Sequence, residues 1–204
     1  FKNNLISDIP TFKRTELGIS HVLERRRVFP HLTVIQNLVL GAWHPKAKEE
    51  LGSSLCEVYK IFPKLESRSS QLAHTMSGGE QQMLAIARGL MGLPKLLMVD
   101  EPFLGLSPLV VKDLIKIFKN VVSEGISILF VEQNVRLALS MADRGYVLES
   151  GRLVIDEWNP SLYKFDESPH KTIRLQLEGK HNFAVEHVEL GGFATLSIKL
   201  KKIN

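Results

Sequence analysis

A strand–helix–strand pattern near the middle of the chain constrains its fold more than any other feature. Two short apolar runs, Leu96–Val99 and Ile126–Val131, lie on either side of an amphipathic segment from Val110 to Val122. Pro108 stands where that helix would begin, because its fixed backbone angle suits the first helical turn. Strands that alternate with crossover helices predict a parallel sheet covered on both faces. We therefore predict an α/β protein.

Weaker patterns extend this prediction toward the amino terminus. The stretch from Ile19 to Leu23 alternates apolar and polar residues, and apolar residues recur at helical spacing from Thr33 to Trp43. Residues 44–75 are more polar, and we expect helix, turn and loop there around Pro63. A helical layer is therefore expected between the first apolar stretch and the central pattern.

Different patterns follow the second central strand. They predict a helix over Val135–Met141 and a hairpin over Gly145–Ile155. From about Trp158 onward the apolar residues recur every second position, as in Thr172–Leu177 and Thr195–Leu200. This period is typical of strands, so we expect a strand-rich tail.

Composition excludes several classes of protein. The chain has 204 residues, enough for one sizeable domain or one domain with an appendage. Its apolar runs are far shorter than the roughly 20 residues that span a membrane. The single Cys56 excludes an internal disulfide and fits a reducing compartment. We therefore expect a soluble, cytosolic domain.

The net charge of +4 and the run Arg25-Arg26-Arg27 raise the question of nucleic-acid binding. Elsewhere the basic residues are scattered and are mostly offset by acids. A solvated or interface face explains the arginine run better, so no nucleic-acid partner is expected.

The most informative segment for function begins at Ser77. Ser77 and Glu80 have the spacing of a capping box, in which each side chain bonds an orphan amide of the other residue. The glycines between them, Gly78 and Gly79, leave the amides at the positive end of the helix unobstructed, which suits a phosphate group. A plain helix start is the simpler interpretation. The glycines favour the phosphate, because each costs about 1 kcal/mol within a helix.

Two adjacent carboxylates, Asp100 and Glu101, end the first central strand. Ligands of parallel sheets bind at the carboxyl ends of the strands. Successive strand residues point to opposite sides, so the two acids can have different tasks. One can hold Mg²⁺ through water and the other can polarise an attacking water. A strand that simply ends in solvent is the alternative.

The order of these motifs resembles the ATP-binding cassette (ABC) ATPase family. The resemblance covers the chain from about Leu5 to Ile155 and implies a P-loop NTPase-like parallel sheet with a helical subdomain. It also implies that the segment from Ser77 through Gly78 and Gly79 to Glu80 binds ATP held mainly by an opposite subunit. By the same resemblance Asp100 coordinates magnesium and Glu101 is the general base. The segment Gly105-Leu106-Ser107-Pro108 takes the D-loop position.

Other segments resemble the ATPases of branched-chain amino-acid importers, or the similar urea or amide type. They are Gly18-Ile19, Glu24, Arg26-Arg27-Val28-Phe29-Pro30, Leu32-Thr33-Val34 and Val131-Glu132-Gln133-Asn134. The resemblance places Glu24 at the Q-loop, beside the nucleotide and its magnesium ion. It places Gln133 in the catalytic set, where glutamine acts by hydrogen bonding because it does not titrate near neutral pH. Phe29, Pro30 and Leu32 then help to receive the permease, with ordinary subdomain core as the alternative.

The sequence also departs from the family pattern. No Gly-x-x-x-x-Gly-Lys-Ser/Thr motif occurs, so we expect the P-loop portion to lie upstream of Phe1. Leu23 and Arg25 replace the proline and glycine usual around the Q-loop residue, and Phe103 stands where a small hydroxyl residue is common. On its own, therefore, the chain is expected to bind ATP weakly and to hydrolyse little of it.

Together these observations predict a cassette over residues 1–157, with a helical subdomain at about 33–92 and a tail of unknown fold over 158–204. The predicted function is ATP hydrolysis with Mg²⁺ that energises import of branched-chain amino acids. The predicted partners are membrane permease subunits and a second ABC ATPase subunit, as a homodimer or heterodimer. The predicted location is the cytoplasmic face of the cell membrane. A non-catalytic remnant that acts through a partner, and a soluble cassette acting on nucleic acid or ribosomes, are the rival hypotheses.

Overall fold

The computed structural model describes two compact units. They comprise residues Phe1–Glu132 and Gln133–Asn204. The described residues are 1–3, 5–134, 137–138, 140–149, 152–158, 173–177, 181–191 and 195–203.

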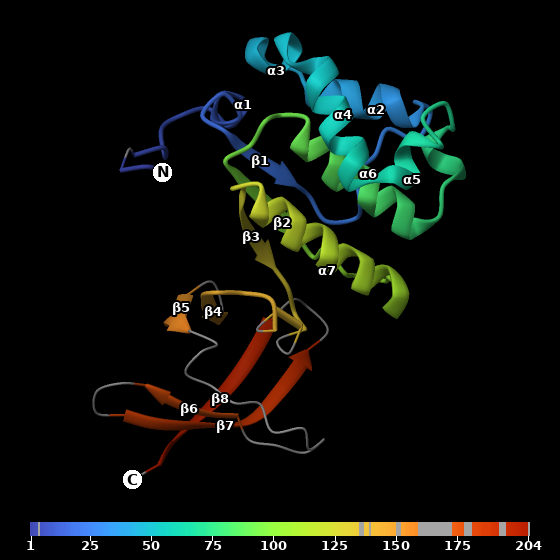
Figure 1. Ribbon diagram of the computed structural model, residues 1–204. Helices are drawn as coiled ribbons and strands as arrows, with labels where there is room; N and C mark the ends of the chain where they lie inside the picture. Colours follow the sequence, from blue (N-terminus) through green and yellow to red (C-terminus); the bar gives the residue numbers. More distant parts are fainter. Residues whose placement is uncertain are drawn as a thin grey trace. The chain divides into compact units, whose positions relative to one another are not determined.

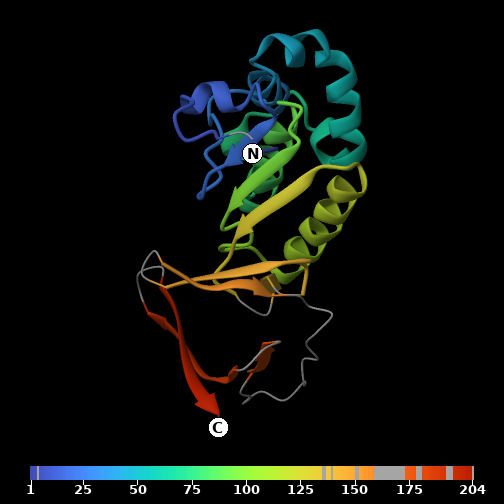
Figure 2. The ribbon, with the colours of Figure 1, turned by 90° about the vertical axis from the view of Figure 1, so that its left-hand side faces the viewer.

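The first unit contains a three-stranded parallel sheet. Its strands are β1 (Ile19–Val22), β2 (Leu96–Asp100) and β3 (Ser127–Val131), in the order β1-β2-β3. Figure 2 shows the three strands side by side and running in the same direction. The α/β fold with a parallel sheet is confirmed.

Helix α7 (Pro108–Ser123) connects β2 to β3 and packs beside β3. The hydroxyl of Ser107 caps its first turn by accepting a hydrogen bond from the Val110 amide at 3.5 Å. Its buried residues lie at helical spacing and face the interior: Leu114, Ile117, Phe118 and Val121. The predicted crossover helix is therefore confirmed, with Pro108 as its first residue.

The sheet is less completely covered at β3 than the sequence predicts. Leu129 and Val131 share one face of this strand and are 44% and 57% exposed, whereas Ile128 and Phe130 on the other face are half-buried. In β2, by contrast, Leu97 and Val99 are almost fully buried. Strand β3 is an edge strand within the described part of the sheet, whereas β2 is central.

A layer of helices lies beside the sheet (Figure 1). Its members and the short helices near them are α1 (Thr11–Arg14), α2 (Val34–Gly41), α3 (Pro45–Glu49), α4 (Leu51–Ile61), α5 (Pro63–Glu66), a 3₁₀ turn (Ala73–Thr75) and α6 (Gly78–Leu90). This agrees with the helix predicted from Thr33 and with the helices and turns predicted over residues 44–75. Of the helices that the structure describes, none is both long and apolar enough to cross a membrane.

Helices α2 and α6 pack closely against each other in this layer. Thr33 begins α2 with a capping box, accepting a bond from the Gln36 amide while its own amide donates to the Gln36 side chain. At the other end of α2, a Cβ placed on Gly41 would lie 2.8 Å from the Met91 Cβ and would overlap the Arg88 carbonyl oxygen. Only glycine therefore lets the two backbones approach this closely.

The second unit is built from antiparallel strands. Strands β4 (Gly145–Glu149) and β5 (Arg152–Trp158) form the predicted hairpin, whose turn residues lie outside the described residues. A second sheet contains β6 (Ile173–Leu177), β7 (His181–Gly191) and β8 (Thr195–Ile203). The strand-rich tail is thus confirmed.

The helix predicted over Val135–Met141 is only partly described. Leu137 and Ala138 are helical, whereas Val135, Arg136 and Leu139 lie outside the described residues.

Candidate nucleotide site

The carboxyl edge of the parallel sheet gathers three of the predicted site residues. In the strand register Val22 lies opposite Val99, and Asp100 lies opposite Val131. Glu24 follows β1 by two residues, and Glu101 follows β2 directly. Three carboxylates therefore reach the same edge of the sheet, as expected for a ligand site in a parallel sheet.

The backbone of Glu101 turns sharply away from the strand. Its φ is +47°, the left-handed region that a residue with a side chain rarely adopts. Its amide donates a hydrogen bond to the Val131 carbonyl at 3.0 Å, which ties this turn to the end of β3. The direction of the Glu101 side chain is thus set by this turn and not by strand alternation, which the sequence argument assumed. Asp100 remains within β2 and is half-buried.

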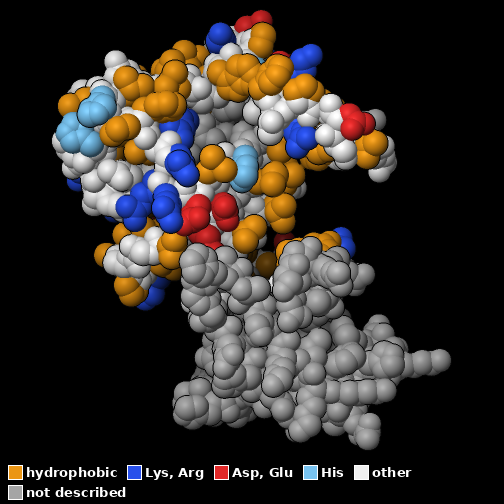
Figure 3. All heavy atoms as spheres, turned by 180° about the vertical axis from the view of Figure 1, so that it is seen from behind, with side chains coloured by type: hydrophobic (Ala, Val, Ile, Leu, Met, Phe, Trp, Pro, Cys, Tyr) orange, Lys and Arg blue, Asp and Glu red, His pale blue; other side chains and the backbone are white. Residues whose placement is uncertain are grey.

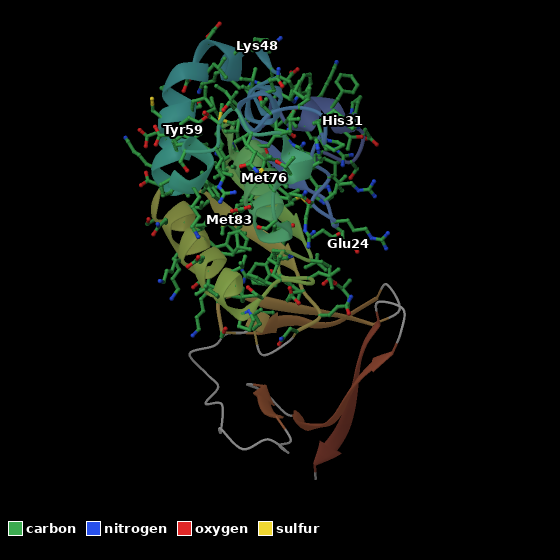
Figure 4. The ribbon with its side chains drawn as sticks, turned by 90° about the vertical axis from the view of Figure 1, so that its right-hand side faces the viewer. Glu24, His31, Lys48, Tyr59, Met76 and Met83 are labelled. Carbon is green, nitrogen blue, oxygen red and sulfur yellow. The ribbon has the colours of Figure 1, made fainter. Side chains whose placement is uncertain are left out.

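Glu24 lies at the margin of this edge. Its side chain is 40% exposed and pairs with Arg25 at 3.3 Å, and Figure 4 shows it projecting outward from the first unit. Gln133 is exposed and is the first residue of the second unit. Glu24, Asp100 and Glu101 thus lie at the end of the sheet in the first unit, whereas Gln133 belongs to the second unit.

The predicted capping box at the start of α6 is present. The Ser77 hydroxyl accepts from the Glu80 amide at 3.4 Å, and the Ser77 amide donates to Glu80 Oε2 at 2.9 Å. Ser77 itself is exposed. Met76, just before Ser77, and Met83, within helix α6, are both 6% exposed or less, and both are labelled in Figure 4. The exposed N-terminus of a well-packed helix is suited to bind an anion.

Both glycines after Ser77 lie close to side chains of other segments. A Cβ on Gly79 would lie 2.9 Å from a methyl group of Val110, so Gly79 lets α6 approach α7. A Cβ on Gly78 would lie 2.7–2.8 Å from the guanidinium atoms of Arg26. The second glycine therefore serves helix packing, and the first accommodates an arginine.

Sequence reasoning missed Arg26, which it grouped with Arg25 and Arg27 as a solvated or interface face. All three arginines have left-handed backbones, with φ of 62°, 67° and 44°. This turn carries the Arg26 guanidinium against Gly78 and to 4.0 Å from where a Cβ on Gly105 would lie. In the sequence, the one possible sign of the contact between Arg26 and Gly78 was the presence of both an arginine run and two glycine-containing loops.

Charges of both signs lie close together on the face shown in Figure 3, where basic side chains border a group of carboxylates. Near the start of α6, Arg68 pairs with Glu80 at 3.1 Å. Burial alone would raise the pKa of Glu80, but the hydrogen bonds from Ser77 and the nearby Arg68 lower it below its ordinary value of 4.5. Glu80 therefore stays ionised and holds the helix start in place.

This lowered pKa predicts an acid-sensitive helix start. Because the folded pKa lies below the unfolded one, the stabilisation by Glu80 is complete above about pH 4.5 and is lost as the pH falls through the folded value. We expect Glu80→Gln to lower the free energy of unfolding by about 0.3–1 kcal/mol at pH 7, a typical helix-terminus charge effect. The difference should be smaller at pH 3 than at pH 7. Urea unfolding followed by circular dichroism at both pH values measures it, and a difference that is equal at both would contradict the assignment.

The residues at the sheet edge fit a magnesium ion only in part. Among the residues that the structure describes, no cluster of three or more His, Cys, Asp or Glu side chains could hold a metal on its own. Magnesium is usually held by one or two carboxylates together with water and substrate phosphates, so a single half-buried carboxylate such as Asp100 suits it.

A parallel sheet with acids at its carboxyl edge and an exposed Ser-Gly-Gly helix start defines a nucleotide-binding α/β protein. The sequence profile of the ABC transporter family matches residues 1–104. The chain belongs to the ABC transporter family.

Two curated relatives carry related names. The high-affinity branched-chain amino acid transport ATP-binding protein BraG of Pseudomonas aeruginosa is 44% identical over 154 residues, covering 76% of this chain and 66% of that protein. A probable branched-chain amino acid transport ATP-binding protein, LivF of Archaeoglobus fulgidus, is 38% identical over 74% of this chain and 64% of its own length. The chain thus spans just under two thirds of these relatives.

Solved structures agree on the fold. An ATP-binding cassette of an ABC transporter in its ADP conformation has a TM-score of 0.67 at 25% identity, covering 78% of this chain and 67% of that one. A dimeric bacterial ABC transporter cassette has a TM-score of 0.64 at 22% identity, covering 78% and 72%. The α/β cassette fold expected from the sequence is therefore confirmed.

Proposed function

We propose that this chain forms part of an ABC ATPase subunit that energises import of branched-chain amino acids through a membrane permease. The observation that carries the proposal is the position of Glu24, Asp100 and Glu101 at or just after the carboxyl ends of two neighbouring strands, in a chain that is 44% identical to a branched-chain amino acid transport ATP-binding protein. ATP with Mg²⁺ is the proposed cofactor.

The residues at the sheet edge have separate roles in this proposal. Asp100 holds the magnesium ion, which neutralises phosphate charge when it is bound. Glu101 accepts a proton from the attacking water, and Gln133 orients groups by hydrogen bonding. Glu24 lies beside the nucleotide and its metal. Its exposed carboxylate is available once it leaves Arg25.

The start of α6 binds nucleotide held by a second ABC ATPase subunit. Ser77, Gly78 and Gly79 offer backbone amides and a hydroxyl to the terminal phosphate, and Glu80 keeps the helix start in shape. A solved relative described as a dimeric cassette supports this arrangement. The two subunits would form a homodimer or a heterodimer.

The permease would contact the surface around Phe29, Pro30 and Leu32, with the subunit at the cytoplasmic face of the membrane. Phe29 is 49% exposed and Pro30 is also exposed, which argues against the core alternative for Phe29, whereas Leu32 is half-buried. We further propose that the cassette covers residues 1–157, with its helical subdomain at about 33–92, and that 158–204 is a tail. The 154 residues that align with the first relative support this division.

A mixed-subunit ATPase assay tests the nucleotide role. The chain is mixed with a complete ABC ATPase that has an intact P-loop and an inactivated signature serine, so that turnover needs Ser77 from this chain. We expect turnover to appear on mixing and to fall about tenfold or more in Ser77→Ala, because a hydrogen bond to a charged phosphate is lost. Ser123→Ala is the matched control, since it removes the same hydroxyl from an exposed position at the end of α7, where it donates to the Asn120 carbonyl.

The outcomes separate the candidate functions. Turnover that depends on Ser77 but not on Ser123 supports the role of the α6 start, and no turnover from a mixture in which the chain is folded and associated with its partner would overturn that role. A non-catalytic remnant would lend the same α6 start to a complete cassette, so turnover that Glu101→Gln leaves unchanged favours the remnant over the ATPase subunit. In the assembled transporter, uptake of leucine and not of urea supports the branched-chain substrate class, and the reverse supports the urea or amide type.

A further inference from the structure

The loop that carries Phe29 is hydrogen-bonded to one buried asparagine of α2. We call residues 27–33 the Phe29 loop. Asn37 of α2 is fully buried, and its Oδ1 accepts from the Phe29 amide at 2.8 Å. Its Nδ2 lies within 3.0–3.3 Å of the carbonyl oxygens of Phe29, Leu32 and Thr33. A single side chain therefore contacts four backbone groups of the loop, and it holds the loop on α2.

Arg88 ties the same loop to a second helix, α6. Its Nη2 donates to the Arg27 carbonyl at 2.7 Å, and its Nη1 donates to Asn37 Oδ1 at 3.4 Å. The guanidinium carbon also lies 5.1 Å from the centre of the Phe29 ring, within cation–π range. Arg88 thus contacts the loop at its backbone, at its aromatic side chain and at the asparagine below it.

This arrangement is specific to arginine. Burial lowers the pKa of Arg88, and within the described part of the chain no carboxylate pairs with it. A half-buried cation without a counter-charge is a poor source of stability. The planar Arg88 guanidinium donates hydrogen bonds in two directions and stacks on a ring. Lysine cannot replace it, because its ammonium group is a single point charge. The geometry of the side chain therefore matters more than its charge.

The three contacts place Phe29 at the rim of a groove. The groove has a volume of about 380 Å³, and its lining includes Phe29, Leu40, Trp43 and Arg88. The three apolar side chains are 42–49% exposed, so they are available to a partner. Helix α6, which carries Arg88, begins beside Ser77 at the proposed phosphate site. One rigid helix thus joins the groove to that site.

We propose that Arg88 is a positioning residue, which fixes the Phe29 loop on α6 so that the groove rim and the helix start at Ser77 move as one body. A partner bound at Phe29 then acts directly on the phosphate-binding end of α6. The identity of that partner as a permease rests on the proposed function, whereas the positioning role of Arg88 does not.

Limited trypsin digestion of the full chain under native conditions tests the proposal. The bond after Arg27 begins the Phe29 loop, so its cleavage should rise when the loop opens locally, and the bonds after Arg25 and Arg26 adjoin it. Mass spectrometry compares their cleavage with that after exposed Lys119 in α7, as an internal reference. We expect the cleavage ratio to rise about tenfold in Arg88→Met, equivalent to about 1.4 kcal/mol of opening free energy.

Two further variants separate positioning from charge and from overall stability. Arg88→Lys keeps the charge but loses the planar guanidinium, and we expect it to raise the ratio as Arg88→Met does. Val58→Ala weakens the core of α4, away from the loop, and should leave the ratio unchanged. A wild-type ratio in Arg88→Lys, or an equal rise in Val58→Ala, would overturn the proposal. If Arg88→Met fails to fold, Arg88→Lys and Val58→Ala still decide the question.

The digestion needs neither nucleotide nor permease. Its failure would therefore leave the ATPase proposal intact, and a failed ATPase assay would leave the positioning role of Arg88 intact.

Discussion

Replacement of Asn37 by leucine is expected to lower the free energy of unfolding by about 1–3 kcal/mol. The Phe29 amide loses the oxygen to which it donates. The carbonyl oxygens of Phe29, Leu32 and Thr33 keep their bonds from the backbone amides of Leu32, Ala73 and Asn37. Each buried polar group left unsatisfied costs about 1–3 kcal/mol. Urea unfolding followed by circular dichroism measures the loss.

The matched control is Asn120→Leu, the same substitution at an exposed position of α7. We expect it to change the free energy of unfolding by less than about 0.5 kcal/mol, as surface substitutions usually do. If both variants lost the same stability, Asn37 would not be holding the Phe29 loop.

Replacement of Gly41 by alanine is expected to destabilise the protein by about 1–3 kcal/mol, and replacement by valine by more. Alanine normally stabilises a helix relative to glycine by about 0.5–1 kcal/mol. Here the new Cβ would overlap the Arg88 carbonyl oxygen and lie 2.8 Å from the Met91 Cβ, so α2 and α6 must separate. Overpacking of this kind outweighs the helix preference.

Gly52→Ala in α4 is the control for Gly41→Ala, because a Cβ on Gly52 would meet no atom within 4 Å. This variant should gain about 0.5–1 kcal/mol. Thermal and urea unfolding of the two variants should therefore shift in opposite directions. A gain in Gly41→Ala would show that the joint between α2 and α6 is looser than the structure has it.

Features that depend on neighbours in the sequence could be predicted from it. The capping box at Ser77, the strand that ends at Asp100 and the helix that begins at Pro108 each rest on residues a few positions apart. Their local signals are strong because hydrogen bonds and apolar spacing act within one element. The fold class and the gathering of acids at one edge follow from these elements.

Features that depend on residues far apart could not be predicted. Arg26 and Gly78 are distant in the sequence, and nothing near either residue indicates their contact. The same is true of Arg88 and the Phe29 loop, which are also distant in the sequence. The turn at Glu101 was missed because a left-handed glutamate has no local signal, and tertiary contacts such as its bond to Val131 stabilise it.

The exposed side chains of β3 have a practical consequence for anyone who handles this protein. Leu129 and Val131 lie on an edge strand, and such an edge offers unpaired backbone groups beside an apolar surface. Purified material should therefore keep best when dilute and cold-stored for short periods, because strand-to-strand association grows with concentration. A charged residue at position 129 would be the first change to make for a sample intended for long spectroscopic experiments.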